Sequence, residues 1–180
     1  MKVWKLKFEL DEYENLIPDK EFTVEDIHSF DGKKQLQNWI PIKVKRMEPE
    51  KNLILSDAPG FLFPVFSKRA LDCLYSLIKS NIEILPLRFE ENEYFGINVI
   101  TVLDAIDYQN SDYKTFRDGK RIMAFKKYAF FNSKILNVPI FKIIDEKTRY
   151  AFVSDEFKKI VETNELTGFK FELVWESDKC

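Results

Sequence analysis

The chain contains 180 residues, of which 45% are hydrophobic and 15% aromatic, and its formal net charge is −2. This composition excludes a disordered or low-complexity chain, because there are enough apolar side chains to form a core. The balanced charge gives no reason by itself to expect a nucleic-acid or membrane partner. The two cysteines, Cys73 and Cys180, argue against a disulfide framework and favour a reducing compartment.

The first predicted element is a strand over residues 4–10. Trp4, Leu6, Phe8 and Leu10 alternate with charged side chains, which is the period-two pattern of a strand with one buried face. Because charges interrupt these apolar residues, the N-terminus lacks the continuous apolar run of a signal peptide. No uncharged run approaches the roughly 20 residues that a membrane helix needs, so we expect a cytoplasmic protein.

Residues 9–31 are strongly acidic. They include nine carboxylates and one lysine, a net charge of −8, so the rest of the chain carries +6. An acidic surface of this kind could steer a basic partner toward the chain, although acidic loops are more often simply solvated. We take seven of these carboxylates as candidates for a partner-binding face: Asp11, Glu12, Glu14, Asp19, Glu21, Glu25 and Asp26.

A second strand is predicted around residues 40–44. Ile40, Ile42 and Val44 alternate with Pro41 and lysine side chains, and the proline favours an edge position because it cannot donate a ladder hydrogen bond. The turn residues at 58–60 then mark a boundary. We therefore divide the chain into an acidic, strand-containing N-terminal segment, residues 1–56, that packs on a main domain, residues 57–180.

The main domain is predicted to begin with a strand and a capped helix. Ser67 follows a short apolar run, and its hydroxyl can accept a backbone N–H hydrogen bond at the start of a helix. Apolar residues then recur at helical spacing, so Leu74 should be buried on a core-facing stripe. Residues 82–89 and 94–102 have the patterns of two further strands.

The end of the chain repeats this organisation. Ser154 should cap a helix that buries Phe157, and Gly168 stands where a left-handed helix terminator is expected. A closing strand follows, with four side chains expected on one face: Phe169, Phe171, Leu173 and Trp175. Two strand–helix–strand units predict an α+β fold in which two or more helices pack on a mainly antiparallel sheet.

No set of residues predicts catalysis or metal binding. His28 is the single histidine, and no nearby side chain supplies the positioned partner that a general base needs. Neither Cys73 nor Cys180 stands at metal-ligand spacing from His28. Three aspartates lack the central glycine and distal glutamate of a calcium loop: Asp104, Asp107 and Asp112.

Two further patterns also favour ordinary structural roles. Glu90, Glu91 and Glu93 could suggest an acid/base pair, but they fall in a predicted hairpin turn, where exposed carboxylates favour a structural role. The scattered glycines form no phosphate-binding loop. We therefore expect no enzymatic activity and no cofactor.

The segment from 113 to 127 mixes basic and aromatic residues. It contains six cations, Lys114, Arg117, Lys120, Arg121, Lys126 and Lys127. Such a mixture can bind single-stranded nucleic acid, but a solvated loop and strand face is the favoured interpretation, because the whole chain lacks a basic balance. Nucleic acid is therefore not an expected partner.

Several short motifs then occur in a fixed order. They are residues 66–71, Pro86, Asn98, residues 102–107, Ser111, and residues 139–142, 152–158 and 166–171. In this order and spacing, residues 57–175 resemble immunity protein family eleven of bacterial polymorphic-toxin systems. The resemblance implies a non-enzymatic protein that binds and neutralises a cognate protein toxin inside the cell.

The acidic residues suggest one form for that toxin. A toxin that attacks nucleic acid carries a basic cleft, so a basic, nuclease-like domain would match them by charge. Two other classes of protein stay open. A structural scaffold or adaptor would expose a large apolar face, and an uncharacterised enzyme would assemble a polar cluster in a pocket only on folding.

Overall fold

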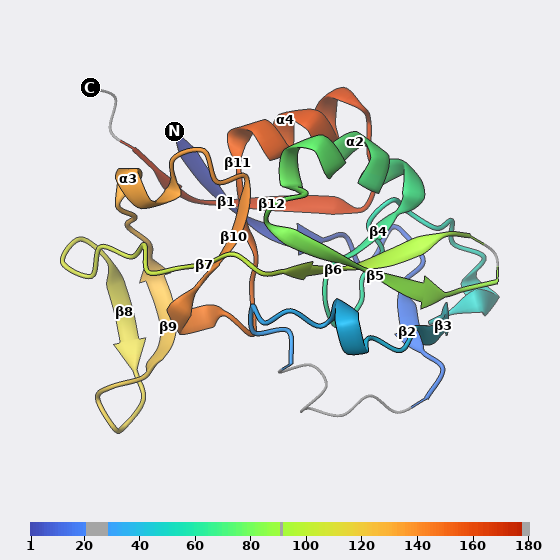
Figure 1. Cartoon of the computed structure of the whole chain (residues 1–180), viewed down its shortest axis with the longest axis horizontal. Coiled ribbons are helices and arrows are strands. Elements are labelled where there is room, and N and C mark those ends of the chain that lie inside the picture. The colour runs from blue at the N-terminus through green and yellow to red at the C-terminus, as the bar shows by residue number, and fades with distance from the viewer. Residues whose placement is uncertain (21–28, 91, 178–180) are drawn as a thin grey trace.

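The first sheet joins the two ends of the chain (Figure 1). In this computed structural model, which describes residues 1–20, 29–90 and 92–177, the strand order is β12–β1–β11–β10–β7. The bounds are β1 Lys2–Phe8, β7 Val102–Leu103, β10 Ile140–Ile143, β11 Phe152–Ser154 and β12 Phe169–Glu176. Strand β1 pairs antiparallel with both β11 and β12, so the N-terminal strand completes a sheet made mostly from the second half of the chain.

The second sheet has the strand order β2–β3–β5–β6–β4. Its bounds are β2 Leu16–Pro18, β3 Ile42–Arg46, β4 Val65–Ser67, β5 Ile82–Arg88 and β6 Tyr94–Val99. Strand β3 lies between β2 and β5, so the edge position expected from Pro41 is wrong. The strand begins at Ile42, after the proline, and Pro41 therefore removes no hydrogen bond from it.

Both five-stranded sheets are mixed, which corrects the expectation of a mainly antiparallel sheet. Strand β10 pairs parallel with β7, and β3 pairs parallel with β5. Parallel neighbours need a long crossover connection, which a local sequence pattern does not reveal. The α+β class itself is confirmed, with strands as the larger component.

Two capped helices lie side by side (Figure 1) and share one core cluster with strands of both five-stranded sheets. Helix α2 is Lys68–Ile78 and helix α4 is Asp155–Thr163. The Ser67 hydroxyl accepts from the Ala70 N–H at 3.1 Å, and the Ser154 hydroxyl accepts from the Phe157 N–H at 3.3 Å, so both predicted caps are confirmed. Leu74 and Phe157 are fully buried in one cluster beneath the helices, as expected.

Shorter helical turns connect these elements. They are α3 Asn132–Ile135 and the 3₁₀ turns η1 Leu36–Asn38, η2 Pro49–Lys51 and η3 Ile144–Glu146. None of the helices in the described part of the chain has the length and apolar content needed to cross a membrane.

A bulge divides the side chains of β12 between two cores. Val3 pairs with Trp175 whereas Trp4 pairs with Leu173, so β12 contains one extra residue at this point. Phe171 packs in the cluster beneath the helices, but Trp175 packs against the second cluster, 5.8 Å from the Phe130 ring. The expectation of one shared face is therefore wrong beyond the bulge.

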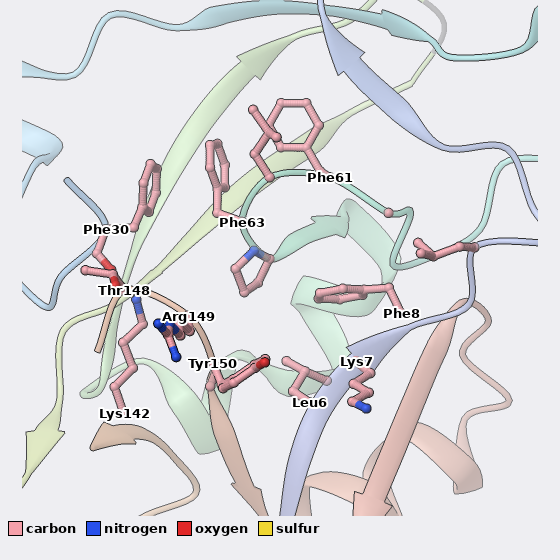
Figure 2. A pocket seen from close by; sticks show the side chains of 15 residues that line it. Leu6, Lys7, Phe8, Phe30, Phe61, Phe63, Lys142, Thr148, Arg149 and Tyr150 are labelled. Atoms are coloured by element: carbon pink, nitrogen blue, oxygen red, sulfur yellow. Dashed lines mark hydrogen bonds between the residues drawn. The ribbon is translucent and has the colours of Figure 1, made fainter. Parts of the chain in front are cut away.

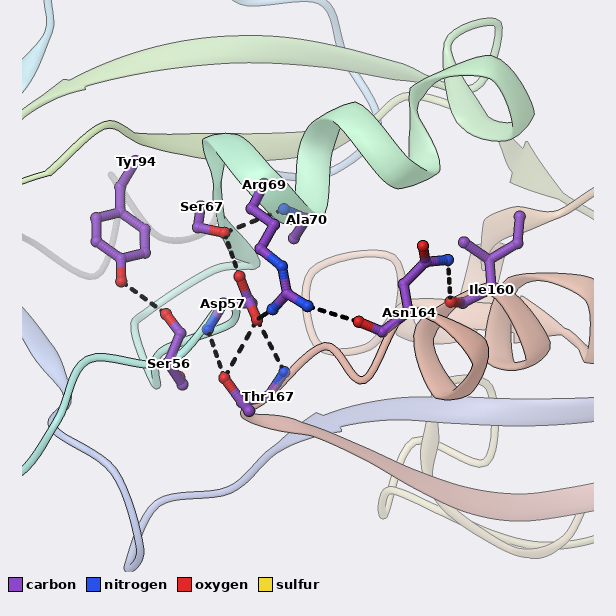
Figure 3. Close-up of polar contacts among 9 residues, drawn as sticks. All are labelled: Ser56, Asp57, Ser67, Arg69, Ala70, Tyr94, Ile160, Asn164 and Thr167. Atoms are coloured by element: carbon purple, nitrogen blue, oxygen red, sulfur yellow. Dashed lines mark hydrogen bonds and ion pairs between the residues drawn. The ribbon is translucent and has the colours of Figure 1, made fainter.

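Asp57 connects helix α2 to the segment before β12 (Figure 3). Its carboxylate accepts from the Ser67 hydroxyl at 2.8 Å, from Arg69 Nη1 at 2.7 Å and from the Thr167 N–H at 3.0 Å. Arg69 also donates to the Asn164 carbonyl at the end of α4, at 2.6 Å. One buried carboxylate thus fixes the start of α2 against the end of α4.

Candidate partner-binding surfaces

The acidic candidates occupy different environments. Asp11 and Glu12 are exposed just beyond the end of β1, whereas Glu14 is buried. Asp19 lies 3.6 Å from Lys43 Nζ and 3.4 Å from Lys45 Nζ. The other three candidates, Glu21, Glu25 and Asp26, lie outside the described residues.

Glu14 is buried and connects two segments of the chain. Its side chain is 1% exposed, Oε1 accepts from the Glu48 N–H at 3.0 Å, and Oε2 lies 3.9 Å from Arg46 Nη1. These contacts hold the segment before β2 against the segment after β3. A partner arriving at the surface of this structure would not touch the Glu14 carboxylate.

Basic residues from distant parts of the chain reduce the local charge of the acidic stretch. Lys170 of β12 lies 3.0 Å from Glu9, and its hydrogen bond and charge hold the pKa of that carboxyl below its usual range. Lys43 and Lys45 of β3 flank Asp19 in the same way. The net charge counted along the sequence therefore overstates the field at this surface.

The remaining titratable residues form no metal cluster within the described ranges. Asp107 caps a turn, since its carboxylate accepts from the Gln109 N–H at 3.1 Å and from the Asn110 side-chain amide at 2.7 Å. Glu90 is exposed and lies 3.8 Å from Lys43. His28 and Glu91 lie outside the described residues.

A largely apolar cavity of about 330 Å³ lies beside the end of β1 (Figure 2). Its walls include Leu6 and Phe8 from β1, Phe61 and Phe63 from the loop before β4, and Tyr150 before β11. Phe63 also stacks on Phe30 with 4.0 Å between ring centroids. The cavity has the size and apolar lining of a small binding site, and it lies next to Leu10, which is exposed.

Lys142 is the buried charge of this cavity. The side chain is 5% exposed, and its ammonium donates to the Phe30 carbonyl oxygen. Burial lowers the pKa of Lys142 to about 8, although the charge of nearby Asp31 opposes this shift. The bond fixes the loop at Phe30 against β10, which gives Lys142 a structural role that its sequence context did not indicate.

A second buried lysine was also missed by the sequence pattern. Lys5 was expected on the polar face of the first strand, but it is 8% exposed. Its ammonium lies 4.9 Å from the centre of the Tyr128 ring and 4.2 Å from that of Tyr150. Tyr128 donates to Glu146 at 2.7 Å, and burial raises the pKa of both of these groups. Lys5 is therefore buried because Tyr128 and Tyr150 cover the side of β1 that was expected to face solvent.

The comparison with protein families decides the relationship of the chain to known proteins. The sequence model of the immunity protein family Imm11 matches residues 86–176. The chain belongs to the Imm11 immunity protein family. The match begins at Pro86, later than the resemblance noted above, and extends through β12. No curated protein matches the chain.

The matched part of this Imm11 protein includes most of the first sheet, helix α4 and the β8–β9 hairpin described below. Asn98 and Lys142 lie within it, and Asn98 Nδ2 donates to Glu83 at 3.0 Å. The acidic residues at 9–31 lie outside it. Family membership therefore bears directly on residues 86–176 and gives no information about the acidic residues at 9–31.

Proposed function

We propose that this Imm11 protein neutralises a cognate toxin by binding it directly, in the cytoplasm and without chemistry of its own. The observation that carries this proposal is membership of an immunity protein family. The fold is consistent with a binding role, because buried aromatic clusters hold the exposed loops and hairpin in fixed positions, which lowers the entropy cost of association.

A narrower form of the proposal concerns the class of toxin. A basic, nuclease-like toxin would be drawn to the exposed carboxylates Asp11 and Glu12, with Asp19 at the side of the same segment. Glu21, Glu25 and Asp26 belong to this narrower proposal because of their sequence position. Its support is the charge of residues 9–31, and it can fail while the broader proposal holds.

The test is co-expression with the toxin encoded beside this gene. We expect the chain to restore growth of cells that produce the toxin and to co-purify with it. A toxin from an unrelated system is the control, and the chain should neither protect against it nor bind it. Continued toxicity in the presence of abundant, folded chain would contradict the proposed function.

A further inference from the structure

The β8–β9 hairpin is a basic projection from the body of the molecule (Figure 1). Strands β8 (Asp112–Thr115) and β9 (Ile122–Lys127) pair only with each other among the described residues, as a separate two-stranded sheet. Residues 112–127 contain six cations and two carboxylates, so the hairpin carries +4 while the rest of the chain carries −6. All six cations are exposed.

Aromatic side chains attach the hairpin firmly to the body. Ring centroids are 5.9 Å apart for Tyr108 and Tyr113, 5.8 Å for Tyr113 and Phe125, and 4.8 Å for Phe125 and Tyr128. Tyr128 is buried in the second core cluster. Arg149 adds a hydrogen bond to the Met123 carbonyl at 2.8 Å. The hairpin is therefore held in one position before any partner arrives.

The tip of the hairpin is also ordered by its own contacts. The Asp118 carboxylate accepts from the backbone N–H groups of Lys120 and Arg121 at 2.9 and 3.1 Å. It also accepts from Arg121 Nε at 2.8 Å, and these bonds lower the pKa of Asp118 to about 2. The Arg121 guanidinium lies 5.1 Å from the centre of the Phe116 ring.

Most of the positive charge remains available to a partner. Lys126 lies 3.6 Å from Asp112, and Arg121 bonds to Asp118. The other four cations have no carboxylate partner within the described part of the chain: Lys114, Arg117, Lys120 and Lys127. Exposed cations on a rigid, projecting support can steer the approach of an oppositely charged surface and fix its orientation.

We propose that the β8–β9 hairpin is the element through which this chain recognises an acidic face of its toxin. The proposal rests on the toxin binding proposed above, but it does not require the toxin to be a nuclease. The hairpin lies within residues 86–176, the part of the chain that matches the family.

A protein surface fits the hairpin better than nucleic acid does. Proteins that bind single strands need exposed aromatic rings on which bases can stack. In the hairpin, Tyr113 and Phe125 are half-buried against each other, and Phe116 is half-buried beside Arg121. The charge of −6 on the rest of the chain would also repel a long phosphate backbone. An acidic protein face need contact only the hairpin.

The test is the rate at which the toxin associates with the variant Arg117→Glu/Lys120→Glu. Neither side chain takes part in the Asp118 turn, so the fold should be retained and can be checked by circular dichroism and thermal unfolding. The matched control is Lys79→Glu/Lys159→Glu, which changes net charge equally on exposed positions of the helical layer. We expect about a tenfold slower association for the hairpin variant at low salt and less than a twofold change for the control. The difference should shrink at high salt, because ions screen the field.

Each other outcome overturns the proposal. Equal association rates for the two variants would remove the hairpin from recognition while leaving toxin binding intact, whereas no binding by the unmodified chain would remove the proposed function itself. Binding of a labelled duplex or single-stranded oligonucleotide that the hairpin variant alone loses would identify nucleic acid as the occupant. Dimerisation in sedimentation runs that the hairpin variant alone loses would identify a second copy of the chain.

Discussion

Asp57 is the single residue on which the contact between the two helices depends most clearly. Its buried carboxylate receives hydrogen bonds from Ser67 and Arg69 at the start of α2 and from Thr167 before β12, far away in the sequence. Removing an acceptor from such a site leaves several donors without partners, and this costs more than the loss of an exposed ion pair.

We predict that Asp57→Ala lowers the free energy of unfolding by about 2–4 kcal/mol. Asp72→Ala is the matched control, because Asp72 pairs with Lys68 on the exposed side of α2 and should contribute less than about 0.5 kcal/mol. Urea unfolding of both variants measures the difference. Equal midpoints for the two would show that the Asp57 contacts do not stabilise the fold.

Because of Lys142, the free energy of unfolding should change with pH in the alkaline range. Burial lowers its pKa from 10.5 in a free side chain to about 8, so between these values the unfolded chain binds the proton and the folded chain does not. Stability contributed by this residue therefore rises with pH across that window. Relative to Lys142→Met, the unmodified chain should gain roughly 2–3 kcal/mol between about pH 7 and pH 10. A constant difference across this range would show that Lys142 keeps its ordinary pKa.

The serine caps were predicted correctly, because the caps at Ser67 and Ser154 depend only on the next three residues. The expectation that Gly168 ends the second helix is wrong: α4 ends at Thr163, and the left-handed residue that follows it is Glu165, with φ 49°. Gly168 also has a positive φ, 82°, but it lies directly before β12. Lys5, Glu14 and Lys142 look like surface charges in sequence, but segments far away in the chain bury them. A burial that depends on distant residues leaves no signal in the local pattern.

At the scale of elements, the helices and the pairing of consecutive strands could be predicted, but the crossovers could not. Strands β5 and β6 pair antiparallel across a short loop, as their patterns indicate. The parallel pairs and the insertion of β1 between β11 and β12 join segments far apart in sequence. The local charge of the acidic stretch could not be predicted for the same reason, because Lys170, Lys43 and Lys45 lie beside its carboxylates only in the folded chain.

The segment after β1 gives a prediction for a toxin surface of the opposite charge to the one proposed to meet the hairpin. If Asp11 and Glu12 meet a basic toxin, Asp11→Asn/Glu12→Gln should slow association at low salt, and the difference should disappear at high salt. We expect a smaller effect than for the hairpin, because Lys170, which pairs with Glu9, is close enough to interact with the charges of Asp11 and Glu12. Asp72→Asn/Glu156→Gln, on the helices, is the matched control. Faster association of the Asp11 and Glu12 variant would indicate that these carboxylates repel the toxin.

At the scale of the whole molecule, charge is separated in space. The projecting hairpin carries +4, and the body carries −6. Such a separation orients the chain relative to a charged partner before contact, which favours rapid and specific association. A protein that protects a cell from a toxin by binding has to capture that toxin quickly, so this arrangement agrees with the proposed function.

Titration of toxin activity with the purified chain tests the proposed function most directly. A binding protein without chemistry of its own should reduce the toxin's activity in proportion to the amount added, with complete inhibition near equimolar chain. Separation of the complex under denaturing conditions should return unmodified toxin that is active after refolding. Inhibition that proceeds with time at a small fraction of the toxin concentration, or a toxin left covalently changed, would contradict neutralisation by binding alone.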